Sequence, residues 1–226
     1  MKKILITGTD TEIGKTVLTS ALAAYYKTYH QQTSLGLMKL IQTGEGDRQL
    51  YQKLFGEVCV PLHYQTPVAP PIAAQKEGRK VELDQVWQAF TSLNQDIVLV
   101  EALGGLGSPV TEELTVADLA AAWRLNTVIV VPVKLGAIAA AVANVALARQ
   151  TGVNLKGIIL NCLHPDSEEN HLNWTPVDLI QSLTNMPVLG MIPYLSDPTN
   201  LEKLAQVASS LDLELFLPLS FQSQTL

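Results

Sequence analysis

Residues 8–16 read Gly8-Thr9-Asp10-Thr11-Glu12-Ile13-Gly14-Lys15-Thr16. This stretch fits the pattern G-x-x-x-x-G-K-[ST], and it lies between an apolar run at residues 4–6 and a helix-forming run at residues 17–26. Backbone N–H groups in such a turn converge on an anion, and the following helix points its positive N-terminal end at the same place. Lys15 can then reach the outer phosphates, and the Thr16 hydroxyl can ligate Mg²⁺. The stretch predicts a phosphate-binding P-loop; an ordinary glycine-containing strand-to-helix turn is the alternative.

Outside the P-loop, short runs rich in Ile, Val and Leu alternate with helix-like segments. The expected strands are 3–7, 34–39, 96–101, 127–133, 155–161 and 187–192. The expected helices are 15–30, 47–55, 83–93, 115–124, 136–150, 176–183 and 201–211. Strands that are apolar on both faces are typical of a parallel sheet covered on each side by helices. The alternation predicts an α/β, P-loop NTPase-like fold with a mostly parallel central sheet, and we expect one domain over residues 1–226.

One segment departs from this alternation. Residues 59–75 contain Pro61, Pro67, Pro70 and Pro71. Because proline lacks a backbone N–H and restricts the residue before it, we expect an ordered irregular loop here, over one end of the sheet.

Composition excludes some classes of partner. Charged residues make up 16% of the 226 residues and the formal net charge is −6, so no basic field is available for nucleic acid or an anionic membrane. No uninterrupted apolar run is long enough for a membrane-spanning helix. Cys59 and Cys162 match no metal or redox spacing, which favours reduced, structural thiols. We therefore expect a cytoplasmic protein that binds neither nucleic acid nor membrane.

Polar residues stand where the expected strands end, which is where ligands gather in open α/β sheets. Lys39 ends one apolar strand, so its ammonium can neutralise charge on a γ-phosphate; a lysine that merely reaches solvent from a strand end is the alternative. Asp47 opens the next helix as either a cap or a metal ligand. Glu101 ends a strongly apolar strand, at a position from which nucleotide hydrolases hold Mg²⁺, and we favour the metal role.

Two later strand ends carry weaker signals. Gly136 opens an alanine-rich helix whose N-terminal amides can bind a substrate carboxylate, while its small residues suit close helix or subunit packing. Asn161 has an amide that can pair with a purine edge, or it serves as a turn residue.

The full pattern resembles the dethiobiotin synthetase family, the ATP-dependent ring-closing ligases of biotin synthesis. Residues 8–16 are similar almost word for word to that family's P-loop. Residues 38–44 (Met-Lys-Leu-Ile-Gln-Thr-Gly) resemble its K-P-x-x-[ST]-G segment, and residues 100–105 (Val-Glu-Ala-Leu-Gly-Gly) resemble its V-E-G-A-G-G segment. Residues 133–136 resemble its strand-to-helix turn, so the resemblance runs nearly end to end.

The resemblance implies a triphosphate site with its metal. Thr16, Asp47 and Glu101 would ligate Mg²⁺, and Lys15 and Lys39 would flank the γ-phosphate of ATP as the catalytic residues. The phosphates would be held by the backbone of Glu12, Ile13, Gly14, Lys15, Thr16 and Val17.

The resemblance also implies a substrate site. Asn161 and the segment at Pro193 would lie at the adenine, and Thr43 would contact the diamine. The substrate carboxylate would meet the amides of Gly136, Ala137 and Ile138, which the other subunit of a homodimer would supply.

The implied reaction joins CO₂ to 7,8-diaminononanoate with ATP and closes a cyclic urea to give dethiobiotin, ADP and phosphate. It needs no protein nucleophile, which fits a chain without a Ser/His or Cys/His constellation.

The sequence departs from the family pattern at Leu40, at Ala102-Leu103 and at Ala139, and these changes bear on substrate fit more than on ATP binding. Two alternatives remain. One is a MinD-like switch ATPase, which would carry a further lysine where this chain has Asp10; the other is a non-catalytic nucleotide-binding domain.

Overall fold

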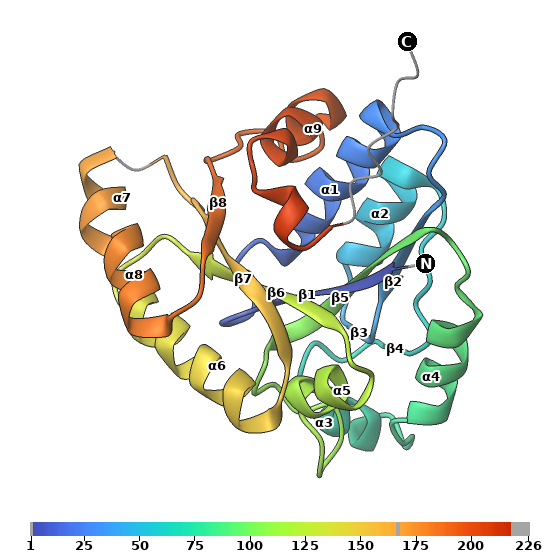
Figure 1. The fold of residues 1–226 in the computed structure, drawn as a ribbon. Helices are drawn as coiled ribbons and strands as arrows, with labels where there is room; N and C mark the ends of the chain where they lie inside the picture. Colours follow the sequence, from blue (N-terminus) through green and yellow to red (C-terminus); the bar gives the residue numbers. More distant parts are fainter. Residues whose placement is uncertain (1, 166–167, 218–226) are drawn as a thin grey trace.

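A computed structural model describes residues 2–165 and 168–217. Its centre is a six-stranded sheet in the order β2-β5-β1-β6-β7-β8, and every neighbouring pair is parallel (Figure 1). The strands are β1 (Lys2–Gly8), β2 (Leu35–Lys39), β5 (Ile97–Gly105), β6 (Asn126–Pro132), β7 (Asn154–Asn161) and β8 (Val188–Ile192). These six strands confirm the strands predicted from the apolar runs and the predicted fold class.

Helices cover both faces of the sheet. On one face lie α1 (Lys15–Tyr29), α2 (Asp47–Phe55) and α9 (Leu201–Ser209), in the upper part of Figure 1. On the other lie α3 (Pro70–Lys76), α4 (Leu83–Ser92), α5 (Val116–Ala122) and α6 (Ala137–Thr151). Beside β8 and α6 lie α7 (Glu168–Trp174) and α8 (Val177–Thr184), and a 3-10 turn, η1 (Leu213–Leu215), follows α9.

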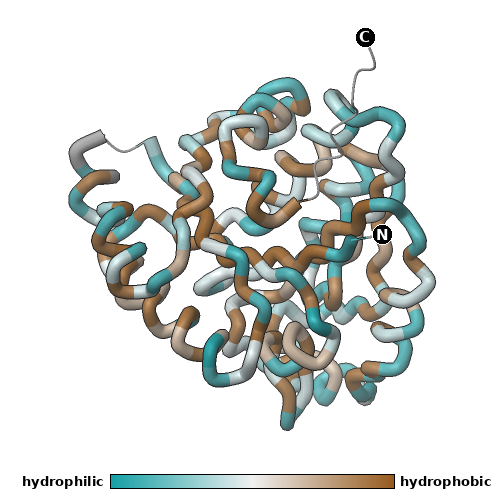
Figure 2. Tube along the Cα trace, viewed as in Figure 1, coloured by the Kyte–Doolittle hydropathy of each residue, from teal (hydrophilic) through white to brown (hydrophobic). Residues whose placement is uncertain are grey.

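The strands are buried on both sides because side chains alternate between two apolar layers. In β1, Ile4 and Ile6 pack into the layer under α1 and α9, whereas Leu5 packs into the opposite layer. All three side chains are fully buried. Figure 2 shows the resulting apolar colouring along the sheet strands. This burial holds the strands in register, and it thereby places their carboxyl ends side by side.

The expectation of an irregular loop over residues 59–75 is wrong for two parts of it. Strand β4 (His63–Tyr64) pairs with β3 (Gln42–Thr43) in a separate two-stranded parallel sheet. Helix α3 begins at Pro70, with proline in its first turn. The prolines do not prevent this helix because first-turn N–H groups have no intrahelical partner and the fixed φ of proline suits the helix.

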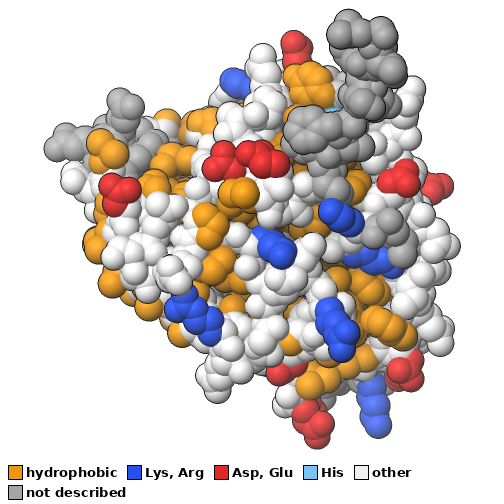
Figure 3. Space-filling view, in the orientation of Figure 1, with side chains coloured by type: hydrophobic (Ala, Val, Ile, Leu, Met, Phe, Trp, Pro, Cys, Tyr) orange, Lys and Arg blue, Asp and Glu red, His pale blue; other side chains and the backbone are white. Residues whose placement is uncertain are grey.

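Within residues 2–165 and 168–217, no helix is long and apolar enough to cross a bilayer. On the face drawn in Figure 3, basic and acidic side chains are interspersed and do not gather into a patch of one sign. Cys59 and Cys162 do not form a disulfide.

Candidate active site

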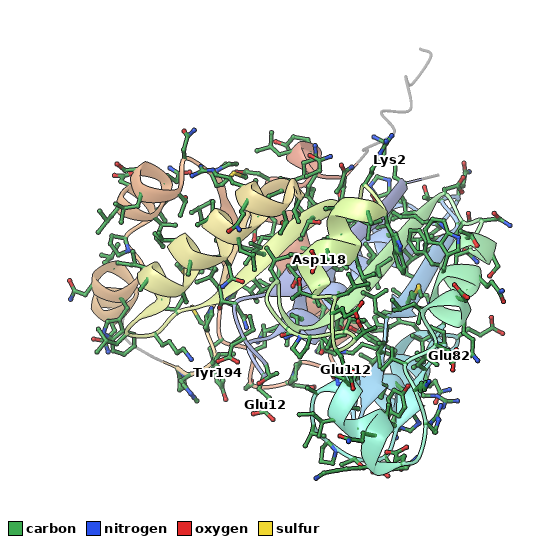
Figure 4. The ribbon with its side chains drawn as sticks, turned by 90° about the horizontal axis from the view of Figure 1, so that it is seen from below. Lys2, Glu12, Glu82, Glu112, Asp118 and Tyr194 are labelled. Carbon is green, nitrogen blue, oxygen red and sulfur yellow. The ribbon has the colours of Figure 1, made fainter. Side chains whose placement is uncertain are left out.

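The P-loop joins β1 to α1 and has the backbone conformation that its glycine predicts. Gly14 has φ +92°, in the left-handed region, and caps the N-terminus of α1. A Cβ at Gly14 would lie 1.9 Å from Asn161 Nδ2, so no larger side chain fits there. Glu12 also has a positive φ, 54°, and its side chain is exposed and points outward from the loop (Figure 4).

Asn161 lies at the end of β7 and contacts the P-loop directly. Its Nδ2 donates to the carbonyl oxygen of Ile13 at 2.8 Å, and the residue is 2% exposed. The amide thus holds the loop from the neighbouring strand end. The adenine contact predicted for Asn161 stays a prediction.

Lys15 begins α1 with its side chain buried. Its Nζ donates to the carbonyl oxygen of Asp10 at 2.7 Å, which folds the side chain back over the loop. Burial lowers the pKa of Lys15 to about 8; nearby Lys39 also lowers it, while the Glu101 and Asp47 carboxylates oppose the shift. An ammonium with so little solvation interacts strongly with an incoming anion.

A cluster of four side chains lines the same cavity as Lys15. The register of the sheet pairs Lys39 of β2 with Glu101 of β5, which brings the two strand-end side chains together. Lys39 Nζ donates to Asp47 Oδ2 at 2.6 Å and to Glu101 Oε1. The Thr16 hydroxyl donates to Asp47 Oδ1 or Glu101 Oε1, at 3.0 and 3.1 Å. Residues 85 positions apart in the chain therefore share one polar cluster.

The charges in this cluster support one another. Burial acts to lower the pKa of Lys39, but the Glu101 and Asp47 carboxylates outweigh it and raise that pKa above its usual value. Burial acts to raise the pKa of Asp47, but Lys39 outweighs it and holds that pKa below its usual value. Lys39 therefore stays protonated and Asp47 ionised at neutral pH. Asp47 is not the cap of α2, because that position is Gly46.

Tyr51 is a further member of this cluster, and no sequence pattern indicated it. Its hydroxyl donates to Glu101 Oε2, and burial, followed by the Glu101 charge, raises its pKa well above the usual value. The hydroxyl is therefore a permanent donor near neutral pH. Tyrosine is common in cores, so only a contact map could have identified this role.

A cavity of about 260 Å³ lies among these groups. It is lined by Thr11, Glu12, Ile13, Gly14, Lys15, Thr16, Lys39, Gln42, Thr43, Glu45, Asp47, Glu101, Leu103 and Gly104. Nine of the predicted site residues are in this lining, whereas Thr11, Gln42, Glu45, Leu103 and Gly104 were not predicted as contacts. Of the departures from the family pattern, Leu103 reaches the cavity, while Ala102 is fully buried in the core.

The remaining predicted site residues lie outside that lining. Val17 packs against the apolar layer under α1, and Pro193 is exposed just after β8. Tyr194, its neighbour, is also exposed and is labelled in Figure 4. Their roles at the nucleotide stay predictions.

The three residues predicted to meet the substrate carboxylate begin α6. Gly136 is exposed and has φ +89°, Ala137 is buried, and Ile138 is half-buried. The Ala137 N–H donates to the carbonyl oxygen of Lys134 at 3.1 Å. None of the three lines the cavity, so their predicted role depends on a second subunit and stays a prediction.

The oxygen atoms in the cavity fit a small hard cation. In the part of the chain that the structure describes, no three His, Cys, Asp or Glu side chains form a metal cluster. One hydroxyl and two carboxylates do converge, from Thr16, Asp47 and Glu101. This set suits Mg²⁺, which takes one or two carboxylates and completes its shell with phosphate oxygens and water.

A larger cavity, about 580 Å³, lies elsewhere, near Arg79 and Glu112. No P-loop residue lines it, so the arrangement of donors and charges, and not volume, identifies the site.

A parallel sheet that presents a P-loop, two lysines and two carboxylates at one edge defines a P-loop nucleoside-triphosphate-binding protein. In agreement, residues 2–202 match the family model of an AAA domain. The fold is similar to that of the MinC:MinD cell division protein complex of Aquifex aeolicus, with TM-score 0.55 and 18% identity over 97% of this chain and 98% of that chain. A ParA family ATPase from Chlorobium tepidum also has TM-score 0.55, with 14% identity over 95% and 92% of the two chains.

Comparison with curated protein sequences identifies the family within this class of P-loop proteins. The ATP-dependent dethiobiotin synthetase BioD of Gloeothece citriformis is 64% identical, over 97% of this chain and all of its own length. The protein of the same name from Synechocystis is 53% identical over 94% of each chain. The chain belongs to the dethiobiotin synthetase family, as its P-loop and lysine motifs predicted.

Proposed function

We propose that this protein is an ATP-dependent ligase of biotin biosynthesis that forms dethiobiotin from 7,8-diaminononanoate and CO₂. The observation that carries the proposal is the convergence of Lys15 and Lys39 on one cavity with Asp47 and Glu101, in a chain 64% identical to a curated synthetase. The fold it shares with MinD and ParA proteins carries no such information about activity.

The chemistry runs through a carbamate. One amine of the substrate adds to CO₂, and the resulting carbamate oxygen attacks the γ-phosphorus of ATP and expels ADP. The second amine then attacks the carbonyl carbon of the mixed anhydride. This step closes the cyclic urea and expels phosphate, which keeps the carbamate oxygen. No bond to the protein forms, so the protein acts by positioning and by charge.

Two lysines would supply positive charge to the transferred phosphoryl group. Lys15 and Lys39 both line the cavity, and both would face the phosphoryl oxygens that carry charge during transfer. Lys39 stays protonated because of its carboxylate partners. A bound triphosphate would favour the protonated form of Lys15 as well.

Thr16, Asp47 and Glu101 would hold Mg²⁺, as the convergence of their oxygens supports. The cation would supply Lewis-acid charge at the β- and γ-phosphates. Burial of Glu101, which is fully inaccessible, keeps that ligand in a fixed place.

The diamine would lie beyond the γ-phosphate, against Thr43, which lines the same cavity. Its carboxylate would reach the α6 N-terminus of a second copy, at Gly136, Ala137 and Ile138. Leu135, just before that helix, is an apolar side chain that is 83% exposed, and it would be covered at such an interface. Adenine would lie at Asn161 and Pro193. We further propose a cytoplasmic location, which suits two cysteines that form no disulfide.

The test is product formation. The protein is incubated with diaminononanoate, bicarbonate, Mg²⁺ and ATP, and dethiobiotin is sought by mass spectrometry. Dethiobiotin formed in proportion to ADP supports the proposal. ATP binding without dethiobiotin would instead identify a non-catalytic nucleotide-binding protein.

A further inference from the structure

Glu101 is a buried carboxylate whose two oxygens have different partners. Oε1 accepts from the Lys39 ammonium and lies 3.1 Å from the Thr16 hydroxyl, on the side of the cavity. Oε2 accepts from the Tyr51 hydroxyl. Tyr51 is 1% exposed and Glu101 is fully buried, so water does not compete for this contact.

The Tyr51 contact fixes the orientation of the carboxylate. A buried carboxylate oxygen without a donor carries a large desolvation cost, so the hydroxyl favours the one rotamer that places Oε2 beside it. That rotamer directs Oε1 at Thr16 and Lys39. Removing the hydroxyl would remove the reason for this orientation.

Tyr51 also lies on the same helix as another proposed ligand. Asp47 begins α2 and Tyr51 follows four residues later, so the two share one face of the helix. Helix α2 thus brings Asp47 to the cavity and Tyr51 under Glu101. One helix therefore carries both the Asp47 carboxylate and the hydroxyl that contacts the Glu101 carboxylate.

We infer that Tyr51 is a positioning residue that holds Glu101 in the orientation that binds the divalent cation. The inference rests on the proposed Mg²⁺ site and goes beyond it, because it assigns metal affinity to a side chain that does not touch the metal.

The test uses Mn²⁺ as a spectroscopic probe in the presence of ADP. In Tyr51→Phe, which removes only the hydroxyl, the dissociation constant of Mn²⁺ measured by electron paramagnetic resonance is expected to rise about tenfold or more. The affinity for ADP alone, measured in EDTA, is expected to stay within about twofold. Unchanged Mn²⁺ affinity would overturn the inference, as would an equal loss of ADP affinity in EDTA.

Two controls separate positioning from general damage. Tyr26 is another buried tyrosine, on α1, and no hydrogen-bond partner for its hydroxyl is found in the described residues. Tyr26→Phe is expected to leave Mn²⁺ affinity unchanged. In a Glu101→Gln background, Tyr51→Phe is expected to have little further effect, since it acts through Glu101; full additivity would contradict the inference.

Tyr51→Met provides a second hydroxyl-free variant if Tyr51→Phe is too unstable to measure, because methionine fills irregular apolar space. Mn²⁺ binding does not require ring closure. If the unmodified protein binds Mn²⁺ and ADP normally but forms no dethiobiotin, the result therefore counts against the proposed function alone. If the unmodified protein forms dethiobiotin and Tyr51→Phe has unchanged Mn²⁺ affinity, the result counts against the positioning role of Tyr51 alone.

Discussion

The two ends of the proposed active site differ in how completely one chain builds them. At the phosphate end, Lys15, Lys39 and Glu101 are at most 6% exposed, and each has hydrogen-bond partners within the chain. At the proposed substrate-carboxylate end, Leu135 is 83% exposed and Gly136 is open to solvent. On the proposed function, one chain supplies the groups of the phosphate end, whereas recognition of the diamine would need a second copy.

Removing the P-loop lysine should have the largest effect, because Lys15 belongs to the proposed phosphate end of the site. Lys15→Ala is expected to lower ATP turnover about 10²–10³-fold, because the charge facing the γ-phosphate is lost. Initial-rate assays of ADP release check this. Lys27→Ala, at the exposed end of the same helix, is the matched control and should retain full turnover. Turnover above a tenth of normal in Lys15→Ala would contradict the role.

The second lysine should separate chemistry from nucleotide binding. Lys39→Ala is expected to slow turnover about 10²-fold while nucleotide affinity changes only a few-fold. Because Asp47 and Glu101 then lack their cation, we also expect about 3 kcal/mol lower stability without Mg²⁺, recovered in part when Mg²⁺ is added. Calorimetry and thermal denaturation measure both. Equal loss of nucleotide affinity in the two lysine variants would remove the distinction between them.

A substitution at the proposed substrate-carboxylate end should affect diamine binding and not nucleotide binding. Leu135→Asp is expected to weaken the proposed dimer and raise KM for the diamine about tenfold, with ADP affinity unchanged, since a charge would be costly at the proposed apolar contact. Sedimentation and steady-state kinetics provide the readout. Leu172→Asp, at another exposed leucine on α7, is the control. A variant dimer as stable as the original would argue against an interface at this helix.

The hydrogen bond from Asn161 of β7 to the P-loop should have a smaller effect on nucleotide affinity. Asn161→Ala removes the hydrogen bond to the Ile13 carbonyl, worth about 1 kcal/mol, so nucleotide affinity should fall about fivefold. Asn154→Ala, at the exposed start of the same strand, should have no effect on affinity. Titration calorimetry with ADP distinguishes them; identical affinities would show that this hydrogen bond is dispensable.

The smallest expected effect is on pH dependence. The pKa of Lys15 is about 8 in the free protein and should be higher beside a triphosphate, so binding takes up a proton above that pH. ATP affinity should therefore fall as pH rises, by about threefold between about pH 7.5 and about pH 8.5. Lys15→Arg, which stays charged, should lose this dependence. A rise in affinity over that range would give the wrong sign.

Most residues of the proposed phosphate end could be predicted from the sequence, because the patterns that indicate them are local. A P-loop pattern and a charged residue at the end of an apolar run, such as Lys39 or Glu101, depend on neighbours in the chain. The contacts that were missed join distant residues. Tyr51 meets Glu101 across 50 positions, and Asn161 meets Ile13 across 148, with no local pattern to mark either.

Helix α3 was missed for a different reason. A cluster of prolines predicts irregular structure, but the effect of each proline depends on its position, and Pro70 lies in the first turn where it is tolerated. Apolar runs located the six strands of the central sheet but not the short strands β3 and β4. The meaning of a proline depends on a helix start that no neighbouring pattern defines.

The central claim is that a carbamate is phosphorylated at the edge of the sheet, and transfer of oxygen from bicarbonate tests it most directly. With ¹⁸O-labelled bicarbonate, the phosphate released with dethiobiotin should carry one ¹⁸O atom, detected by mass spectrometry. The label in the ureido oxygen of dethiobiotin reports how much survives exchange with water. Labelled dethiobiotin accompanied by unlabelled phosphate would contradict the account.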